Sequence, residues 1–146
     1  MKKQDITTSR LDDILKSVKS DKDIREYLDK YTNVQYSTFA EYFNSYVIDR
    51  KLSLTEIIEK SNISRNYFYN ILNGDRNPGR DKIIALCIGA GMDVKETNRA
   101  LKIAKEGILY SKDKRDALII ISIHDSINSI TELNIILDEA GLPLLK

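Results

Sequence analysis

The side chains best suited to chemistry stand together in residues 64–82, a stretch that opens with Ser64, Arg65 and Asn66. An arginine can bind guanine through two hydrogen bonds, and an asparagine can bind adenine in the same way. A serine and the free backbone amides at the start of a helix are suited to a phosphate group, so we expect Ser64 to contact the DNA backbone. Four side chains are expected to read base edges: Arg65, Asn66, Tyr69 and Asn70.

Basic residues gather around the same stretch. The whole chain carries 23 basic and 22 acidic residues, a net charge of +1, whereas residues 60–82 hold five basic and two acidic residues, a net +3. A near-neutral net charge argues against a protein whose whole surface is basic. It does not exclude a local basic face, because nucleic-acid binding depends on where the charge lies. Three of these five basic residues, Arg76, Arg80 and Lys82, lie just beyond the four side chains expected to read bases, and there we expect contacts to DNA phosphates.

Other kinds of functional site find little support in the sequence. Cys87 is the only cysteine and His124 the only histidine, so neither a disulfide framework nor a multi-histidine zinc site can be built. Residues 89–91, Gly-Ala-Gly, lack the following Lys and Ser/Thr of a phosphate-binding loop and are typical of a helix end. We therefore predict no catalytic residue, no metal and no cofactor, and we do not expect an enzyme.

Two short helices must position the reading stretch. Ser53-Leu54-Thr55-Glu56 has the pattern of a capping box and predicts a helix start, and Asn62 suits its end because asparagine tolerates the left-handed backbone conformation. Ser64 is predicted to cap a second helix over residues 64–72. Its inner face is predicted to carry Phe68, Ile71 and Leu72.

Three further helices are predicted around this pair. A helix over about residues 38–50 has its apolar side chains on one face. Another is predicted from Pro78 to Gly91, and a third starts at the box-like cap Asp93-Val94-Lys95-Glu96 and ends at Gly107. The apolar face of the first consists of Phe39, Tyr42, Phe43, Tyr46 and Val47.

Residues 52–78, LSLTEIIEKSNISRNYFYNILNGDRNP, resemble the helix-turn-helix of the XRE (Cro/C1, phage-repressor-like) family. Ile58 stands where the family usually has a small inward residue, Asn62 stands at the turn position, and Arg76-Asn77-Pro78 resembles the loop into the fourth helix. The match covers about residues 36–106. The resemblance implies a five-helix domain that presents its third helix to DNA, in a bacterial or phage regulator of transcription.

Two zones flank this predicted DNA-binding domain. Residues 1–35 predict an N-terminal extension of two short amphipathic helices. Residues 107–146 predict a C-terminal helical pair, whose second helix starts at the capping pattern Ser129-Ile130-Thr131-Glu132. The pair has more apolar surface than two helices need, so we expect it either to pack on the domain or to form a dimer face.

The first helix of that pair is predicted to be largely buried. Within it Asp116 stands four residues after Lys112, and we expect the two to form a local ion pair. The buried apolar set is predicted to include Ala117, Leu118, Ile120, Ile121 and Ile127, with Ile119 and Ile123 widening the face.

Together these patterns predict an all-α protein that binds double-stranded DNA as a sequence-specific transcriptional regulator. A homodimer would read two half-sites about one helical turn apart. The longest apolar run, residues 117–121, is too short to cross a bilayer and no signal peptide is visible, so we expect a cytoplasmic protein without a membrane partner. The alternative is a protein–protein interaction module on the same scaffold, favoured by the near-neutral charge and the aromatic residues 67–69.

Overall fold

The computed structural model describes residues 16, 20, 22, 24 and 36–146. Contacts between residues divide the chain into two units, Met1–Tyr36 and Ser37–Lys146, and the fold described below is that of the second. The two helices predicted in residues 1–35 lie outside the described residues, apart from four isolated positions. Residues 107–146 belong to the same compact unit as residues 37–106.

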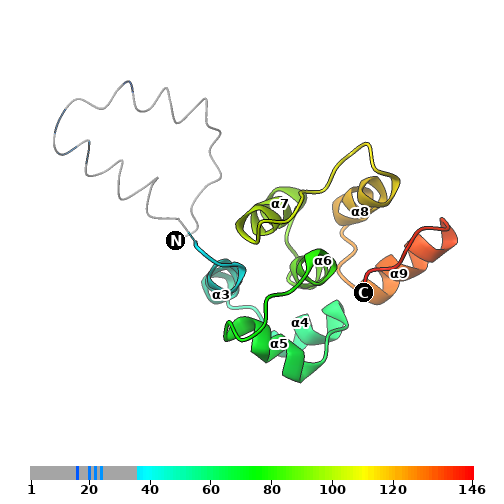
Figure 1. Ribbon diagram of the computed structural model, residues 1–146, viewed down its shortest axis with the longest axis horizontal. Coiled ribbons are helices and arrows are strands. Elements are labelled where there is room, and N and C mark those ends of the chain that lie inside the picture. The colour runs from blue at the N-terminus through cyan, green and yellow to red at the C-terminus, as the bar shows by residue number, and fades with distance from the viewer. Residues whose placement is uncertain (1–15, 17–19, 21, 23, 25–35) are drawn as a thin grey trace. The chain divides into compact units, whose positions relative to one another are not determined.

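The described part of the chain from residue 36 onward is helical and has no strand, which confirms the predicted all-α class. None of the described helices is long and apolar enough to cross a membrane. Figure 1 shows the seven helices of this unit, which are α3 (Phe39–Arg50), α4 (Leu54–Ser61), α5 (Arg65–Leu72), α6 (Arg80–Gly89), α7 (Val94–Ile103), α8 (Lys114–His124) and α9 (Ile130–Glu139).

Helix α6 forms the centre of the core. Every residue from Ile83 to Gly89 is buried, as expected of a helix that is apolar on all sides. Helices α4, α7 and α9 all pack against it (Figure 1). Cys87 belongs to this core, where it is fully buried and packs as a small apolar side chain.

Helix α3 joins α5 to α7 by packing against both. The five apolar side chains predicted on its inner face are all buried. Phe43 lies against Phe68 of α5 in an edge-to-face arrangement, with ring centroids 6.4 Å apart. The Asn44 side-chain amide donates a hydrogen bond to the Leu72 carbonyl (3.1 Å), which satisfies one of the free carbonyls at the end of α5.

The predicted helix starts are formed by local capping bonds. Ser53 accepts a hydrogen bond from the backbone amide of Glu56 (3.3 Å), which is the serine half of the predicted box. At α7 both halves are formed: the Asp93 carboxylate accepts from the Glu96 amide (2.7 Å), and the Asp93 amide donates to the Glu96 carboxylate (3.1 Å). The helix predicted to begin at Pro78 instead begins at Arg80, with Gly79 as its N-cap.

Helices α4 and α6 cross at Gly89. A Cβ atom on this residue would lie 3.1 Å from both the Cβ and the backbone nitrogen of Ser61, and 3.2 Å from the carbonyl oxygen of Ile57. The glycine therefore sets how closely the two helices approach. This close crossing fixes the position of α4, and α4 leads directly into the turn before α5.

The C-terminal helices pack on the other five. Helices α8 and α9 contact each other, α9 contacts α4 and α6, and α8 contacts α7. The buried face of α8 carries Asp116, Ile119 and Ser122. Ile121, predicted to be buried, is 54% exposed. Residues 116, 119 and 122 are three apart and form the side of α8 that faces the core, whereas Ile121 lies on another side of the helix.

Candidate nucleic-acid interface

A tight turn connects α4 to α5. Asn62 adopts the predicted left-handed conformation (φ 56°, ψ 41°) and ends α4. Ile63 is buried and anchors the turn in the core. The Ser64 hydroxyl then accepts a hydrogen bond from the Tyr67 amide (3.2 Å) and caps α5. The result is two eight-residue helices separated by three residues, at the positions predicted from the sequence.

Helix α5 is clearly divided into an inner and an outer side. Phe68 and Ile71 are buried to within 1% of complete coverage. Ser64, Arg65 and Asn66 are all exposed at the beginning of the helix. Its first turn is thus open to solvent while its middle is held in the core.

Aromatic side chains support the outer side of α5. Tyr69 is 37% exposed, and its ring packs edge-on against Phe68 at a centroid distance of 5.6 Å. The ammonium nitrogen of Lys82, on the first turn of α6, lies 5.9 Å from the centre of the Tyr67 ring. At this distance a cation is attracted to the ring face, which helps to hold Lys82 beside α5.

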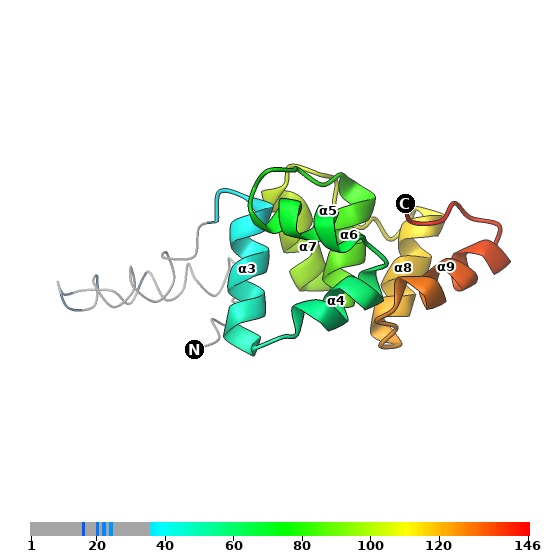
Figure 2. The same ribbon diagram turned by 90° about the horizontal axis from the view of Figure 1, so that it is seen from below.

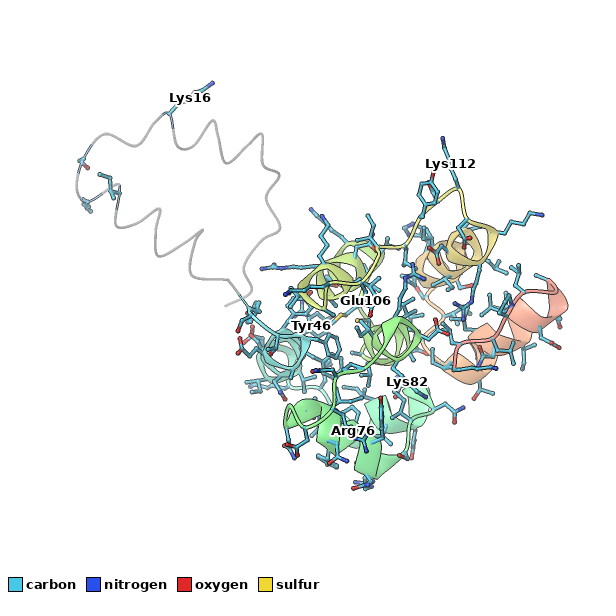
Figure 3. The ribbon with its side chains drawn as sticks, in the orientation of Figure 1. Lys16, Tyr46, Arg76, Lys82, Glu106 and Lys112 are labelled. Carbon is cyan, nitrogen blue, oxygen red and sulfur yellow. The ribbon has the colours of Figure 1, made fainter. Side chains whose placement is uncertain are left out.

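The loop that follows α5 presents Arg76. The Asn70 carbonyl accepts hydrogen bonds from the amides of both Asp75 (2.9 Å) and Arg76 (3.1 Å), which folds the loop back on the helix end. The side chain of Arg76 is exposed and forms no hydrogen bond or ion pair with the described residues. Figure 3 shows Arg76 and Lys82 at the same end of the unit, the end formed by α4 and α5.

Arg80 has a different position from the one expected. Its guanidinium donates two hydrogen bonds to the carboxylate of Asp116 on α8 (2.8 and 3.1 Å). It donates two more to the carbonyls of Gly107 (2.9 Å) and Ile108 (3.1 Å). Arg80 therefore joins α6 to α8, and its guanidinium is occupied within the protein instead of being held out toward a phosphate as expected.

The same interaction corrects the ion pair predicted between Lys112 and Asp116. Asp116 is only 5% exposed, and a buried carboxylate needs donors that reach it inside the protein. The planar fork of Arg80 matches the two carboxylate oxygens, and the Tyr110 amide donates a further hydrogen bond (2.9 Å). Lys112 is exposed and lies outside this arrangement.

A second ion pair lies beside the first. Arg115 donates to both carboxylate oxygens of Asp81 (2.8 and 3.0 Å) and to the carbonyls of Pro143 (2.9 Å) and Leu144 (2.7 Å). Burial alone would raise the pKa of Asp81, but the hydrogen bonds from Arg115 and from the Lys146 amide outweigh it and lower this pKa. Neighbouring residues of α6 are thus paired with neighbouring residues of α8.

These pairs leave the local charge unchanged. Once Arg80 and Asp81 are both taken as paired, residues 60–82 retain four basic residues and one acidic residue, still a net +3. On α4 the exposed Glu56 and Glu59 add negative charge. One of the four cations, Lys60, lies on α4 with these two carboxylates, and the other three, Arg65, Arg76 and Lys82, form a positive surface on α5, the loop after it and the start of α6. We call this surface the α5 face; it consists of Ser64, Arg65, Asn66, Tyr69, Asn70, Arg76 and Lys82.

The other ionisable side chains in the core do not form a site of their own. Burial raises the pKa of Tyr46 to about 12 and also raises the pKa of the Cys87 thiol, so both side chains are protonated at neutral pH. Tyr46 is covered by the guanidinium of Arg50, 3.6 Å from the ring centre. Within the described residues, no group of three or more His, Cys, Asp or Glu side chains is arranged to hold a metal ion.

Comparison of the chain with protein-family models, with curated proteins and with solved structures gives no match.

Proposed function

We propose that the protein is a sequence-specific DNA-binding regulator of transcription that places α5 in the major groove. The observation that carries this proposal is the open first turn of α5, where Ser64, Arg65 and Asn66 are exposed while Phe68 and Ile71 fix the helix in the core. A helix that reads DNA must have such a rigid inner side and a free leading end. The resemblance of residues 52–78 to the XRE family points in the same direction.

The exposed side chains suit the edges of bases. The major groove is about 12 Å wide and admits an α-helix, whose leading residues then face the bases. In that position Arg65 would bind guanine and Asn66 would bind adenine, each through two hydrogen bonds. Tyr69 and Asn70, one turn further along, would contact the bases that follow.

The flanking groups suit phosphates. The Ser64 oxygen accepts from the Tyr67 amide, so its hydroxyl proton remains free to donate to a phosphate oxygen. Arg76 and Lys82 add two cations beside the helix. Because the chain as a whole is nearly neutral, its affinity for random DNA should be low. Specific binding would then depend on a few side chains and on a homodimer that reads two half-sites.

A protein–protein interaction module is the competing proposal. It is favoured by Tyr69, an exposed aromatic side chain in the middle of the α5 face, and by Ile121 and Ile135, which are 54% and 55% exposed. Aromatic and apolar anchors of this kind commonly form the centre of protein interfaces. Against it, the exposed first turn of α5 is polar and basic.

Selection of bound duplexes from a random library at about 0.15 M salt tests the proposal, and salt must be fixed because phosphate contacts depend on it. Arg65→Ala should weaken binding to the selected site by about 5- to 150-fold and relax the preference at one base pair. Arg76→Ala should weaken binding to all DNA sequences alike and reduce the slope of the logarithm of the binding constant against that of the salt concentration by about 1. Lys112→Ala, which removes one exposed cation from another part of the unit, is the matched control. If no sequence is enriched over the starting library, the proposal is wrong.

A further inference from the structure

A second basic surface lies on α7. Lys95, Arg99 and Lys102 follow one another at intervals of four and three residues, so they share one side of the helix. Lys105 follows the C-cap residue Ala104. The three lysines are exposed, and the guanidinium of Arg99 lies 5.5 Å from the centre of the Tyr42 ring. We call these four side chains the α7 face.

Among the described residues, two acidic side chains near the α7 face are already engaged. The Glu96 carboxylate is bound by Arg50 (2.9 Å) and by the Asp93 amide (3.1 Å). The Asp93 carboxylate in turn caps the helix. Lys105 has a left-handed backbone (φ 60°), so the chain leaves the helix before Glu106. Lys95 and Lys102 therefore lie exposed on one side of α7, beside Arg99, and Lys105 adds a third exposed ammonium just beyond the helix.

The α7 face and the α5 face lie on opposite sides of α6. In Figure 1, α4 and α5 lie below α6 and α7 lies above it, and Figure 2, seen from below, has α5 in front of α6 and α7. Helix α3 packs against both α5 and α7. Since α6 lies between the two faces, we expect a straight duplex seated on α5 not to reach α7, and the α7 face would then serve a different molecule or a different segment.

The composition of the α7 face favours a phosphate backbone over a protein surface. Protein interfaces are depleted in lysine and rely on apolar or aromatic anchors at their centre. None of the large apolar side chains that stand exposed among the described residues belongs to α7. Lysines without such anchors are suited to backbone phosphates, which they contact without reading sequence.

We propose that the α7 face binds the sugar-phosphate backbone of a second nucleic-acid segment, independently of its sequence. Together with the α5 face it would allow one chain to hold two duplexes, one on each side of α6. This inference goes beyond the proposed function, because the α7 face would bind phosphates whether or not α5 reads bases. DNA and RNA duplexes share this backbone chemistry, so both belong in the test.

The test uses two variants of the full chain with equal charge. K95Q/K102Q/K105Q removes three lysines of the α7 face, and K112Q/K114Q/K146Q removes three exposed lysines elsewhere. Each change takes the formal net charge from +1 to −2, since three positive charges are lost. Arg99 is retained because it packs on Tyr42. Thermal unfolding followed by circular dichroism establishes that both variants remain folded.

The first measurement is of duplex binding by the α7 face, in a chain whose α5 face has been weakened. In an R65A/R76A background, a labelled random 30-base-pair DNA or RNA duplex is titrated in 50 mM salt, and binding is followed by fluorescence anisotropy. Three neutralised phosphates give a log–log salt slope of about −2.7, which is a loss of about 40-fold between 50 and 200 mM salt. The K95Q/K102Q/K105Q change should remove most of this binding, by about tenfold or more at 50 mM salt, whereas the control should remain close to the background.

The second measurement concerns two duplexes at once. The full chain is bound to beads that carry an immobilised duplex, and capture of a second, fluorescent duplex is recorded. Capture should be lost with K95Q/K102Q/K105Q and kept with K112Q/K114Q/K146Q. The inference would be overturned if the two variants bind and capture duplexes equally well. It would be overturned in favour of a protein partner if the K95Q/K102Q/K105Q change alters only the self-association of the chain. Enrichment of a DNA sequence without any effect of the α7 lysines refutes this inference alone, whereas α7-dependent capture without enrichment refutes only the proposed function.

Discussion

Replacing Arg80 by alanine should destabilise the fold and leave the phosphate contacts intact. Arg80 forms four hydrogen bonds, two of them to a carboxylate that is 5% exposed. Its removal leaves Asp116 buried with the Tyr110 amide as a remaining donor. Loss of one partner of a buried ion pair costs about 3–5 kcal/mol. Because the Arg80 side chain is 26% exposed and water can partly replace it, we expect the lower end, about 3 kcal/mol.

The assay is urea denaturation at pH 7, combined with thermal unfolding. For a unit of this size a loss of about 3 kcal/mol lowers the midpoint of thermal unfolding by about 10–20 °C. Arg76→Ala is the control, because that side chain is exposed and makes no bond with the described residues, and its effect should stay within about 0.5 kcal/mol. Asp116→Asn and the double variant complete a cycle, whose coupling energy should reach about 2 kcal/mol.

The opposite result is easily recognised. If Arg80→Ala lowers the free energy of unfolding by less than about 1 kcal/mol and also reduces the salt slope of DNA binding by about 1, then Arg80 is a phosphate contact. The ion pair with Asp116 would in that case contribute little in solution, and the original prediction for Arg80 would be restored.

Two further predictions concern the core and the second ion pair. Gly89→Ala should lower the free energy of unfolding by about 1 kcal/mol, because the new Cβ would lie 3.1–3.2 Å from backbone atoms of Ser61 and Ile57 and overpacking outweighs the gain in helix propensity. Gly107→Ala, with no atom within 4 Å of the new Cβ, is the control, and equal stability of the two variants would contradict the close crossing. Asp81 has a lowered pKa in the folded protein, so its contribution to stability is present above the unfolded value of about 3.9 and is lost as the pH falls through the lower folded value. Asp81→Asn should therefore reduce the loss of stability between pH 7 and pH 2 in urea denaturation, whereas Asp75→Asn, at an exposed position, should not.

The helix starts could be predicted because they depend on local bonds. Ser53, Ser64 and Asp93 each accept a hydrogen bond from an amide three residues later, and the residue types alone indicate this. The left-handed conformation at Asn62 is equally local. The inner face of α3 followed from apolar spacing, because only one side of that helix is apolar.

The position of Arg80 could not be predicted in this way. Its partner Asp116 is 36 residues away, and the sequence offered Lys112 as a nearer cation. Local charge spacing favours pairs within one helix, whereas burial of a carboxylate is decided by how helices pack. The prediction of which side of α8 is buried was wrong for a related reason. Residues 117–121 are apolar without interruption, so their spacing cannot show which side faces the core, and the buried Asp116 and Ser122 gave no apolar signal.

The salt dependence of the proposed DNA binding is an independent test of whether Arg80 contacts a phosphate. With Arg76 and Lys82 as the cations on phosphates, each chain should contribute a slope of about −1.8, and a homodimer about −3.6. If Arg80 also contacted a phosphate, the two values would be about −2.7 and −5.4. The difference exists only because Asp116 on α8 holds Arg80. The C-terminal helices thus determine which basic side chains at the start of α6 remain free, and the two neighbouring cations Arg80 and Lys82 differ in role although their charge is the same.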